Sequence, residues 1–271
     1  MTGPIVTIDD PQDPRIAPYV AVRERDLAGR CGDFIAEGDV VVRTLSAVQD
    51  RCPARSLLVA RRRLERVKDL IDAFPISVPI YVAEQRVMDA VVGFPIHRGL
   101  LAHARRPREV SVSEFFARPA ERTIILVALG VSNHDNMGGL FRNSAAFGVD
   151  AVLIDADCCD PLYRKAIRVS VGAALKVPFA RIARDQDPIG LLEGAGLTPV
   201  ALSAGAKDDL RDVRWPARTA LLVGAEGPGL PAQVLARVQA VSIPMAPGWD
   251  SLNVAAASAV ALFCATAGRG V

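Results

Sequence analysis

The segment TIILVALGVSNHDNMGGLFRNSAAFGVDAVLID, residues 123–155, decides the fold. It predicts an apolar strand at 123–130, a helix at 136–147 and a second strand at 151–155. A strand, a helix and another strand in succession favour two parallel strands joined by a crossover helix. We therefore expect a parallel-sheet α/β domain to begin at residue 123.

The same alternation continues to the end of the chain. Further strands are expected at 176–182, 197–203, 219–227 and 240–245. Further helices are expected around 161–170, at 188–196, at 231–238 and from Ser251 onward. Residues 123–271 are therefore predicted to form one α/β domain of ordinary size.

A smaller α/β domain is expected upstream, at 31–108. The domain opens with a helical pattern within FIAEGDVVVRTLSAV (34–48). Its predicted strands are 55–60, 79–84 and 99–105, and its further predicted helices are 62–74 and 85–93. Residues 1–30 are rich in proline and charge and are expected to be an arm, not core. Residues 109–122 have a broken apolar pattern and are expected to be a linker.

Composition excludes several classes of protein. Lys+Arg is 32 against Asp+Glu 30, a net charge of +2, so any nucleic-acid site must be a local patch. The five cysteines, at 31, 52, 158, 159 and 264, have no zinc-site spacing and indicate reduced intracellular thiols. The N-terminus lacks the apolar run of a signal peptide, and no segment is suited to span a bilayer. We expect a cytoplasmic protein without a metal or a membrane.

Familiar catalytic and phosphate-binding patterns are missing. The sequence has no GxxxxGK[ST] motif and no GxGxxG after the first strand of either domain. Its three histidines, at 97, 103 and 134, give poor support for a Ser-His-Asp or metal centre.

Three polar, glycine-bearing segments follow predicted strands, at the sheet edge where open α/β sheets bind ligands. In the first, 132–150, Asn133 and Asn136 can cap a helix, and Gly138-Gly139 allows another backbone to come close. Arg142 follows near a helix N-terminus, which favours anions. The plain alternative is a helix cap with a surface arginine.

The second and third segments are LLVGAEGPGL (221–230) and IPMAPGWDSLNVAAASAVALF (243–263). Glu226 has no Lys or Arg partner in its loop, so this loop suits a neutral or cationic ligand, unless it is only a tight turn. Ser251 is placed to cap the last helix, with Asn253 in the first turn, and the Ala-rich helix beyond can pack closely on a neighbour.

Together, in this order, the three segments resemble the signature of the TrmH/SpoU family of RNA methyltransferases, within the SPOUT superfamily. The resemblance spans 133–263, and FIAEG (34–38) with its helical continuation is similar to the opening of the family's ribosomal-protein-like RNA-binding domain. The sequence departs from the common pattern at His134-Asp135, Gly139, Trp249 and Ala255. None of these changes removes a catalytic group, but Trp249 is expected to alter the target pocket.

The resemblance implies an S-adenosylmethionine-dependent enzyme that methylates a ribose 2′-hydroxyl in rRNA or tRNA. It implies a trefoil-knotted parallel-sheet C-terminal domain and a homodimer with active sites at the interface. The catalytic positions carried over are Asn136, Arg142, Glu226, Ser251 and Asn253. The cofactor positions carried over are Leu202, Ser203, Gly224, Ala225, Glu226, Ile243, Met245 and Leu252.

Two roles stay open at this stage. Arg142 is either a general base or a group that binds the target phosphate and stabilises the developing oxyanion. We favour the second role, because a guanidinium stays protonated at neutral pH. Ser251 and Asn253 would then orient the ribose. The residues expected to contact RNA phosphates are Arg61, Arg62, Arg63, Arg66, Lys68, Arg98, Arg105 and Arg106, with Arg108 beside them.

Three alternatives remain. They are a catalytically silent RNA-binding relative of the same fold, a nucleotide-dependent α/β enzyme with a non-standard loop, and a relative that methylates a base.

Overall fold

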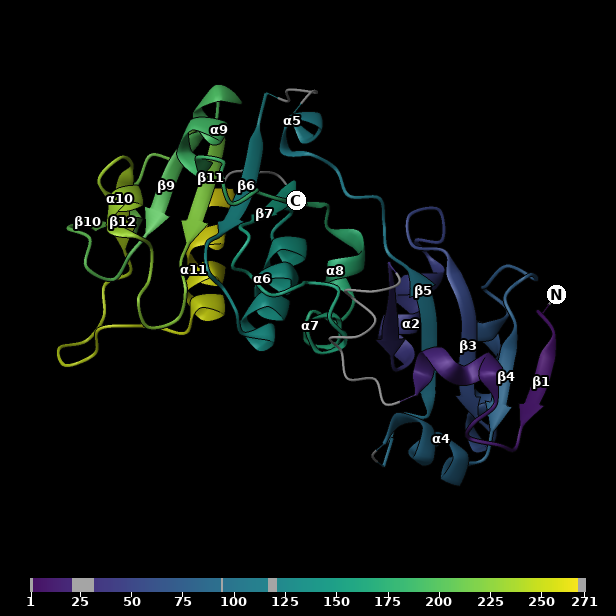
Figure 1. Ribbon diagram of the computed structural model, residues 1–271. Helices are drawn as coiled ribbons and strands as arrows, with labels where there is room; N and C mark the ends of the chain where they lie inside the picture. Colours follow the sequence, from purple (N-terminus) through teal and green to yellow (C-terminus); the bar gives the residue numbers. More distant parts are fainter. Residues whose placement is uncertain (1, 21–31, 94, 117–120, 268–271) are drawn as a thin grey trace. The chain divides into compact units, whose positions relative to one another are not determined.

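The computed structural model describes residues 2–20, 32–93, 95–116 and 121–267 (Figure 1). The chain divides into two units. The first combines Met1–Arg108 with Leu162–Lys176, and the second combines Glu109–Pro161 with Val177–Val271. Cys31 and most of the segment between the first helical turn and the second strand lie outside the described residues.

The second unit is built on a seven-stranded sheet in which every pair of neighbours is parallel. The order across the sheet is β10-β12-β9-β11-β6-β7-β8. In chain order the strands are β6 (Thr123–Ala128), β7 (Ala151–Ile154), β8 (Phe179–Arg181), β9 (Thr198–Leu202), β10 (Asp208–Asp209), β11 (Arg218–Val223) and β12 (Gln239–Ser242), with the 3₁₀ turn η4 (Leu210–Asp212) after β10.

Helices cover both faces of this sheet, as expected for parallel strands that are apolar throughout. One core joins residues of alternate strand positions, such as Ile125 and Leu222, to α5 (Val112–Phe115), α9 (Pro188–Gly194) and α10 (Ala232–Leu235). The intervening positions, such as Leu126, are also buried, and α6 (His134–Ala146) and α11 (Val254–Thr266) pack over them and against each other (Figure 1).

The strand order determines the path of the last segment. β12 lies beyond β9, whereas α11 contacts α6, which follows the more central β6. Residues 243–253 must therefore cross back past the carboxyl ends of β9 and β11 before α11 begins. This path is consistent with the expected trefoil knot.

The first unit contains a five-stranded mixed sheet in the order β1-β4-β3-β5-β2. Neighbours among β1, β4 and β3 are parallel, whereas β5 is antiparallel to both β3 and β2. The strands are β1 (Ile5–Ile8), β2 (Asp33–Glu37), β3 (Ala54–Ala60), β4 (Ile80–Ala83) and β5 (Leu100–Arg105). The helices α2 (Asp39–Ser46) and α4 (Gln85–Val92) lie where the sequence predicts them.

The expectation that residues 1–30 form an arm is wrong for residues 2–20. β1 pairs with β4 at the edge of the sheet, and the 3₁₀ helix η1 (Pro14–Tyr19) buries Ile16 and Tyr19 completely. The proline and charge of this segment obscured three core residues, Ile8, Ile16 and Tyr19. Residues 21–30 lie outside the described part of the chain.

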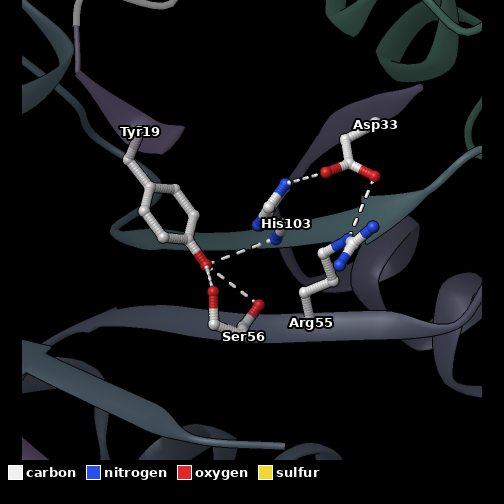
Figure 2. A network of polar contacts seen from close by, with 5 residues as sticks. All are labelled: Tyr19, Asp33, Arg55, Ser56 and His103. Atoms are coloured by element: carbon white, nitrogen blue, oxygen red, sulfur yellow. Dashed lines mark hydrogen bonds and ion pairs between the residues drawn. The ribbon is translucent and has the colours of Figure 1, made fainter. Parts of the chain in front are cut away.

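A buried polar network fixes η1 to the sheet (Figure 2). The Tyr19 hydroxyl lies 2.9 Å from the Ser56 carbonyl oxygen and accepts a 3.3 Å bond from the His103 backbone N–H. The ring of His103 in turn contacts Asp33 through Nε2 at 2.9 Å, and the other carboxylate oxygen of Asp33 accepts from Arg55 at 3.0 Å. Four segments distant in sequence are joined in this way.

The continuous helix predicted at 62–74 is also wrong. The chain instead forms the 3₁₀ turns η2 (Arg61–Arg63) and η3 (Glu65–Val67), then the short helix α3 (Lys68–Ile71). Val67 has φ −109° and ψ 15°, outside helical geometry, and interrupts the run. The apolar spacing is therefore shared by three short turns.

The helix expected near 161–170 belongs to the first unit, not to the domain at 123–271. It appears as α7 (Arg164–Val169), followed by α8 (Ala173–Lys176); α7 contacts β2 and α8 contacts α2. Arg164 and Glu37 form an ion pair of 2.9 Å with both side chains largely buried. Amphipathic spacing shows that a helix has a covered face, but not which sheet covers it.

The expected linker, 109–122, is partly structured. Ser111 caps α5, and Val112 joins the core of the second unit. Residues 117–120 lie outside the described part. Within the described residues, no helix has the length and apolar character that crossing a membrane requires.

Candidate active site

A cavity of about 390 Å³ lies at the carboxyl ends of β9, β11 and β12. Its walls come from three segments, the loops at 202–205 and 223–230 and the loop and first turn of α11 at 243–257. All eight expected cofactor positions line it: Leu202, Ser203, Gly224, Ala225, Glu226, Ile243, Met245 and Leu252. The parallel sheet therefore brings together residues that are far apart in the sequence.

The loop after β11 closes on itself. The Gly229 N–H donates to the Ala225 carbonyl at 2.9 Å, and a Cβ on Gly224 would lie 2.2 Å from the Gly229 carbonyl carbon. Only glycine fits at position 224, and the tight turn presents Glu226 to solvent at the cavity. No Lys or Arg is among the described residues that line the cavity, so it carries an acidic group without a basic one.

Asn136 connects two walls of the site. Its Nδ2 donates to Glu226 Oε2 at 2.9 Å, and its Oδ1 accepts from Asn253 Nδ2 at 2.7 Å. Asn136 is only 5 % exposed, so these bonds satisfy a buried amide. It does not cap α6, because Asn133 does so by accepting from Asp135 N and Asn136 N.

The cap of α11 differs from the prediction. Asn253, not Ser251, is the N-cap residue, and its Oδ1 accepts from the backbone N–H groups of Ala255 and Ala256. The Asn253 side chain thus donates a hydrogen bond to Asn136 through its nitrogen and accepts hydrogen bonds from the first turn of α11 through its oxygen. Ser251 lies exposed at the cavity, and its hydroxyl donates to Asp250 Oδ1 at 3.1 Å.

Two expected catalytic residues, Asn136 and Arg142, do not line this cavity, and Asn136 is joined to it through Glu226 and Asn253. Arg142 lies on α6 with an exposed side chain, and it is absent from the described residues that line the cavity. In the described part of the chain it has no ion pair or side-chain hydrogen bond. Asn136, Glu226, Ser251 and Asn253 come together, whereas Arg142 is not part of this arrangement.

Close packing of α6 against α11 supports the site. A Cβ on Gly139 of α6 would lie 2.5 Å from the Cβ of Ala255 on α11. Asn143, one turn further, donates to the Ala255 carbonyl at 2.6 Å and to Ser258 Oγ at 2.9 Å. The close approach expected of the Gly138-Gly139 pair is thus present at Gly139.

Sequence reasoning missed other residues of the cavity. These are Ala204, Gly205, Val223, Gly227, Pro228, Gly229, Leu230, Val254 and Ala257. Most are glycine or apolar and provide shape instead of chemistry. The Gly-Pro-Gly run in the second segment was the available signal.

The basic residues of the first unit lie at two opposite ends of the strands of its sheet. Arg63 donates to the Arg98 carbonyl at 2.7 Å, so Arg98 lies with residues 61–66 at the end where β3 finishes and β5 begins. Arg105 lies at the other end, where β5 finishes. Arg61, Arg63 and Lys68 are paired with Glu84, Asp39 and Asp72. Arg62, Arg66, Arg98 and Arg105 are exposed.

The sequence was compared with protein families and with known proteins. Residues 123–263 match the SpoU rRNA Methylase family. A tRNA/rRNA methyltransferase of Mycobacterium bovis, itself described as uncharacterized, is 41% identical over 265 residues, covering 94% of this chain and 89% of that protein.

Two further proteins support the match. The 23S rRNA (guanosine-2′-O-)-methyltransferase RlmB of Salmonella typhi is 28% identical over 229 residues, covering 82% of this chain and 94% of that protein. The AdoMet-bound rRNA methyltransferase of Sinorhizobium meliloti superimposes with a TM-score of 0.82 at 21% identity, over 98% of this chain and 99% of that one. The likeness in fold extends over both units.

Proposed function

The chain belongs to the SpoU rRNA methylase family, and from this we propose that it transfers a methyl group from S-adenosylmethionine to a ribose 2′-hydroxyl of rRNA or tRNA. The observation that carries the proposal is the cavity at 202–257, where three strand-end loops place one carboxylate and no basic side chain among its described lining residues. Its relatives' activities on ribosomal RNA agree with this chemistry. We place the reaction in the cytoplasm, where these RNAs are made.

The cavity fits the proposed cofactor. S-adenosylmethionine carries a sulfonium and an ammonium but no phosphate, so an acidic loop is suitable and a phosphate cradle is not needed. Glu226 provides the negative charge, and Leu202, Ile243, Met245 and Leu252 provide apolar walls for the rest of the molecule. When bound, the cofactor supplies an electrophilic methyl group for in-line displacement, which depends mainly on positioning.

The hydrogen-bonded chain Asn253–Asn136–Glu226 gives each residue a role. We assign Asn136 and Asn253 to positioning, because both ends of each amide are already occupied within the protein. They hold the Glu226 loop and the start of α11 in register. Ser251 is the exposed hydroxyl at the cavity, so we assign it to the ribose.

Arg142 is assigned to the RNA. Its exposed guanidinium provides a planar pair of donors for a phosphate or for the developing oxyanion. A guanidinium group is a poor proton acceptor, which argues against general-base catalysis. Arg142→Lys keeps the charge but loses the fork, so methylation is expected to fall at least tenfold. Arg214→Lys, an exposed arginine of the same unit, is the matched control.

A homodimer would cover an apolar surface on the second unit. Phe263 of α11 is 66% exposed and Val260, one turn before it, is 41% exposed, and contiguous exposed apolar surface is typical of an interaction site. Phe263 also packs edge-on against Phe147, at the end of α6, with ring centroids 6.4 Å apart. We propose that a second copy packs on this α6/α11 surface.

The first unit is proposed to hold the RNA. Of the expected residues, Arg62, Arg66 and Arg98 lie at the same end of the sheet, after β3 and before β5. They have no ion pair among the described residues. They are therefore better suited to phosphates than Arg61, Arg63 or Lys68, whose charges are already paired. Phosphate contacts of this kind should weaken steeply as salt rises.

One experiment tests the function. The enzyme is incubated with methyl-labelled S-adenosylmethionine and total RNA from a strain lacking the gene, and the modified nucleotide is mapped. Label on a ribose 2′-oxygen supports the proposal, and label on a base identifies a base methyltransferase. Cofactor binding without any label on RNA identifies a silent relative. Calorimetry that finds binding of NAD or ATP, but not of S-adenosylmethionine, identifies a nucleotide-dependent enzyme and overturns the proposal.

A further inference from the structure

Trp249 is the most exposed of the large apolar side chains in the described residues, at 75%. It lies on the loop between β12 and α11, two residues before Ser251 and three before Leu252, both of which line the cavity. Leu252 is itself 46% exposed. An apolar rim therefore stands beside the place where the ribose is assigned.

The loop that carries Trp249 contains a tight turn and ends at a fixed residue. Gly248 has φ +90°, and the Trp249 N–H donates to the Ala246 carbonyl at 3.2 Å, which forms a turn. Four residues later Asn253 is fixed by Asn136 and by the first turn of α11. An indole on a fixed loop loses little conformational freedom when it binds a flat ligand.

The charge around Trp249 indicates which part of an RNA it meets. Asp250 follows directly, and no Lys or Arg is among the described residues that line the cavity. A carboxylate at this point repels phosphate, but it leaves the π face of a neutral nucleobase free to stack. An indole is also among the best stacking surfaces that proteins offer to unpaired bases.

We propose that Trp249 is a positioning residue that stacks on a nucleobase at or beside the methylated nucleotide, and so holds the ribose at the methyl donor. The proposal rests on the proposed RNA methylation. It differs from a second-copy contact, in which Trp249 would be covered by the partner before any RNA is present.

The chain has a built-in spectroscopic control. It has two tryptophans, and the other, Trp215, is half-buried before β11, at the end of the strand opposite to the cavity. Trp215→Phe therefore leaves Trp249 as a single reporter. Excitation at about 295 nm limits absorption by the RNA, and iodide quenching measures how accessible the indole is.

The test uses ribosomal RNA from a strain lacking the gene, with S-adenosylhomocysteine present. In the Trp215→Phe protein, RNA should quench the emission of Trp249 and protect it from iodide. Trp249→Leu should raise the KM for RNA by about 5- to 150-fold, the range of one lost base stack, with the Kd for S-adenosylmethionine unchanged. Trp249→Phe should recover most of this loss.

Other results overturn the proposal. RNA that binds, by gel shift, without changing the emission of Trp249 excludes stacking. Iodide protection that rises with protein concentration in the absence of RNA assigns Trp249 to a dimer interface. A weaker Kd for S-adenosylmethionine in Trp249→Leu assigns it to the cofactor. If wild-type protein neither binds nor methylates the RNA, the proposed function fails, and the stacking proposal fails with it.

Discussion

The Asn136 amide donates a 2.9 Å hydrogen bond to the Glu226 carboxylate, across 90 residues of sequence. This bond joins the helix after β6 to the loop after β11, two neighbouring strands of the sheet. Asn136 is buried, so its nitrogen depends mainly on Glu226 for a hydrogen-bond partner. The orientation of the single carboxylate in the cavity therefore depends on one amide.

Asn136→Asp should weaken cofactor binding more than tenfold at pH 8. The substitution places a second carboxylate against Glu226, and two adjacent like charges disfavour full ionisation, so binding should partly recover at pH 5.5. Asn136→Ala should weaken the free energy of cofactor binding by about 1–3 kcal/mol, because it leaves the partners of a buried hydrogen bond unsatisfied. Calorimetry with S-adenosylmethionine measures both effects.

Asn133→Asp is the matched control for this pair. Asn133 is exposed and caps α6, where an aspartate caps equally well and suits the helix dipole. It should bind the cofactor like wild type. Equal affinities for Asn136→Asp and Asn133→Asp would show that the Asn136–Glu226 bond has no role in the site.

Gly139→Ala should destabilise the second unit by about 1–3 kcal/mol, the usual range for overpacking a core. The added methyl would meet the Cβ of Ala255 at 2.5 Å, so α11 would have to move away from α6. Gly194→Ala is the control, because a Cβ there meets nothing within 4 Å. Urea unfolding followed by circular dichroism should show a lower midpoint for the first variant only; a normal midpoint would mean that α6 and α11 adjust freely.

Much of the site could be predicted because it depends on strand ends. Apolar runs identify strands, and the carboxyl ends of parallel strands meet on one side of a sheet, so the segments 221–230 and 243–263 could be placed together. The position of Ser203 in the site came from the family resemblance alone. The cap of α11 could not be resolved, because Ser251 and Asn253 are both good caps two residues apart. Only the geometry shows that Asn253 has that role.

Tertiary partners were less accessible from the sequence. The pattern of 164–169 predicts a helix, but nothing local tells that it packs on β2 through Arg164 and Glu37. Tyr19 followed a Pro- and charge-rich stretch, and its burial depends on partners at Ser56 and His103 that lie far along the chain.

Tyr19→Phe should destabilise the first unit by about 1–2 kcal/mol, because the hydroxyl is the partner of buried groups at Ser56 and His103. The pKa of Tyr19 is raised well above its ordinary value, mainly by burial. The hydroxyl therefore stays protonated at any working pH. Tyr81→Phe is the control, since Tyr81 lies half-buried on β4, and should change stability by less than about 0.5 kcal/mol. Equal unfolding midpoints would show that the hydrogen bonds of the Tyr19 hydroxyl do not stabilise the unit.

The stability of the first unit should fall as the pH drops below about 6.5, the ordinary pKa of a histidine. Burial lowers the pKa of His103, and attraction by Asp33 offsets this only in part. A lowered pKa in the folded state means that the unfolded chain takes up the proton first, so acidification favours unfolding. His103→Gln should flatten the dependence between pH 5 and 7.5, whereas His97→Gln, at an exposed histidine, should not. A flat wild-type profile would contradict the prediction.

Cys52 and Cys158 should resist iodoacetamide at pH 8 in the folded protein. Burial raises the pKa of Cys52 to about 11 and that of Cys158 to about 12, and the thiolate is the reactive form. The Cys158 thiol also donates to the Ala128 carbonyl at 3.3 Å, inside the core below the active-site edge. Peptide mass spectrometry should find both residues labelled only in urea, where the ordinary pKa returns.

The half-buried Cys159, with its pKa raised to about 11 by burial, should be labelled slowly, and faster as the pH rises. Rapid labelling of Cys158 in the native protein would mean that the end of β6 opens to solvent.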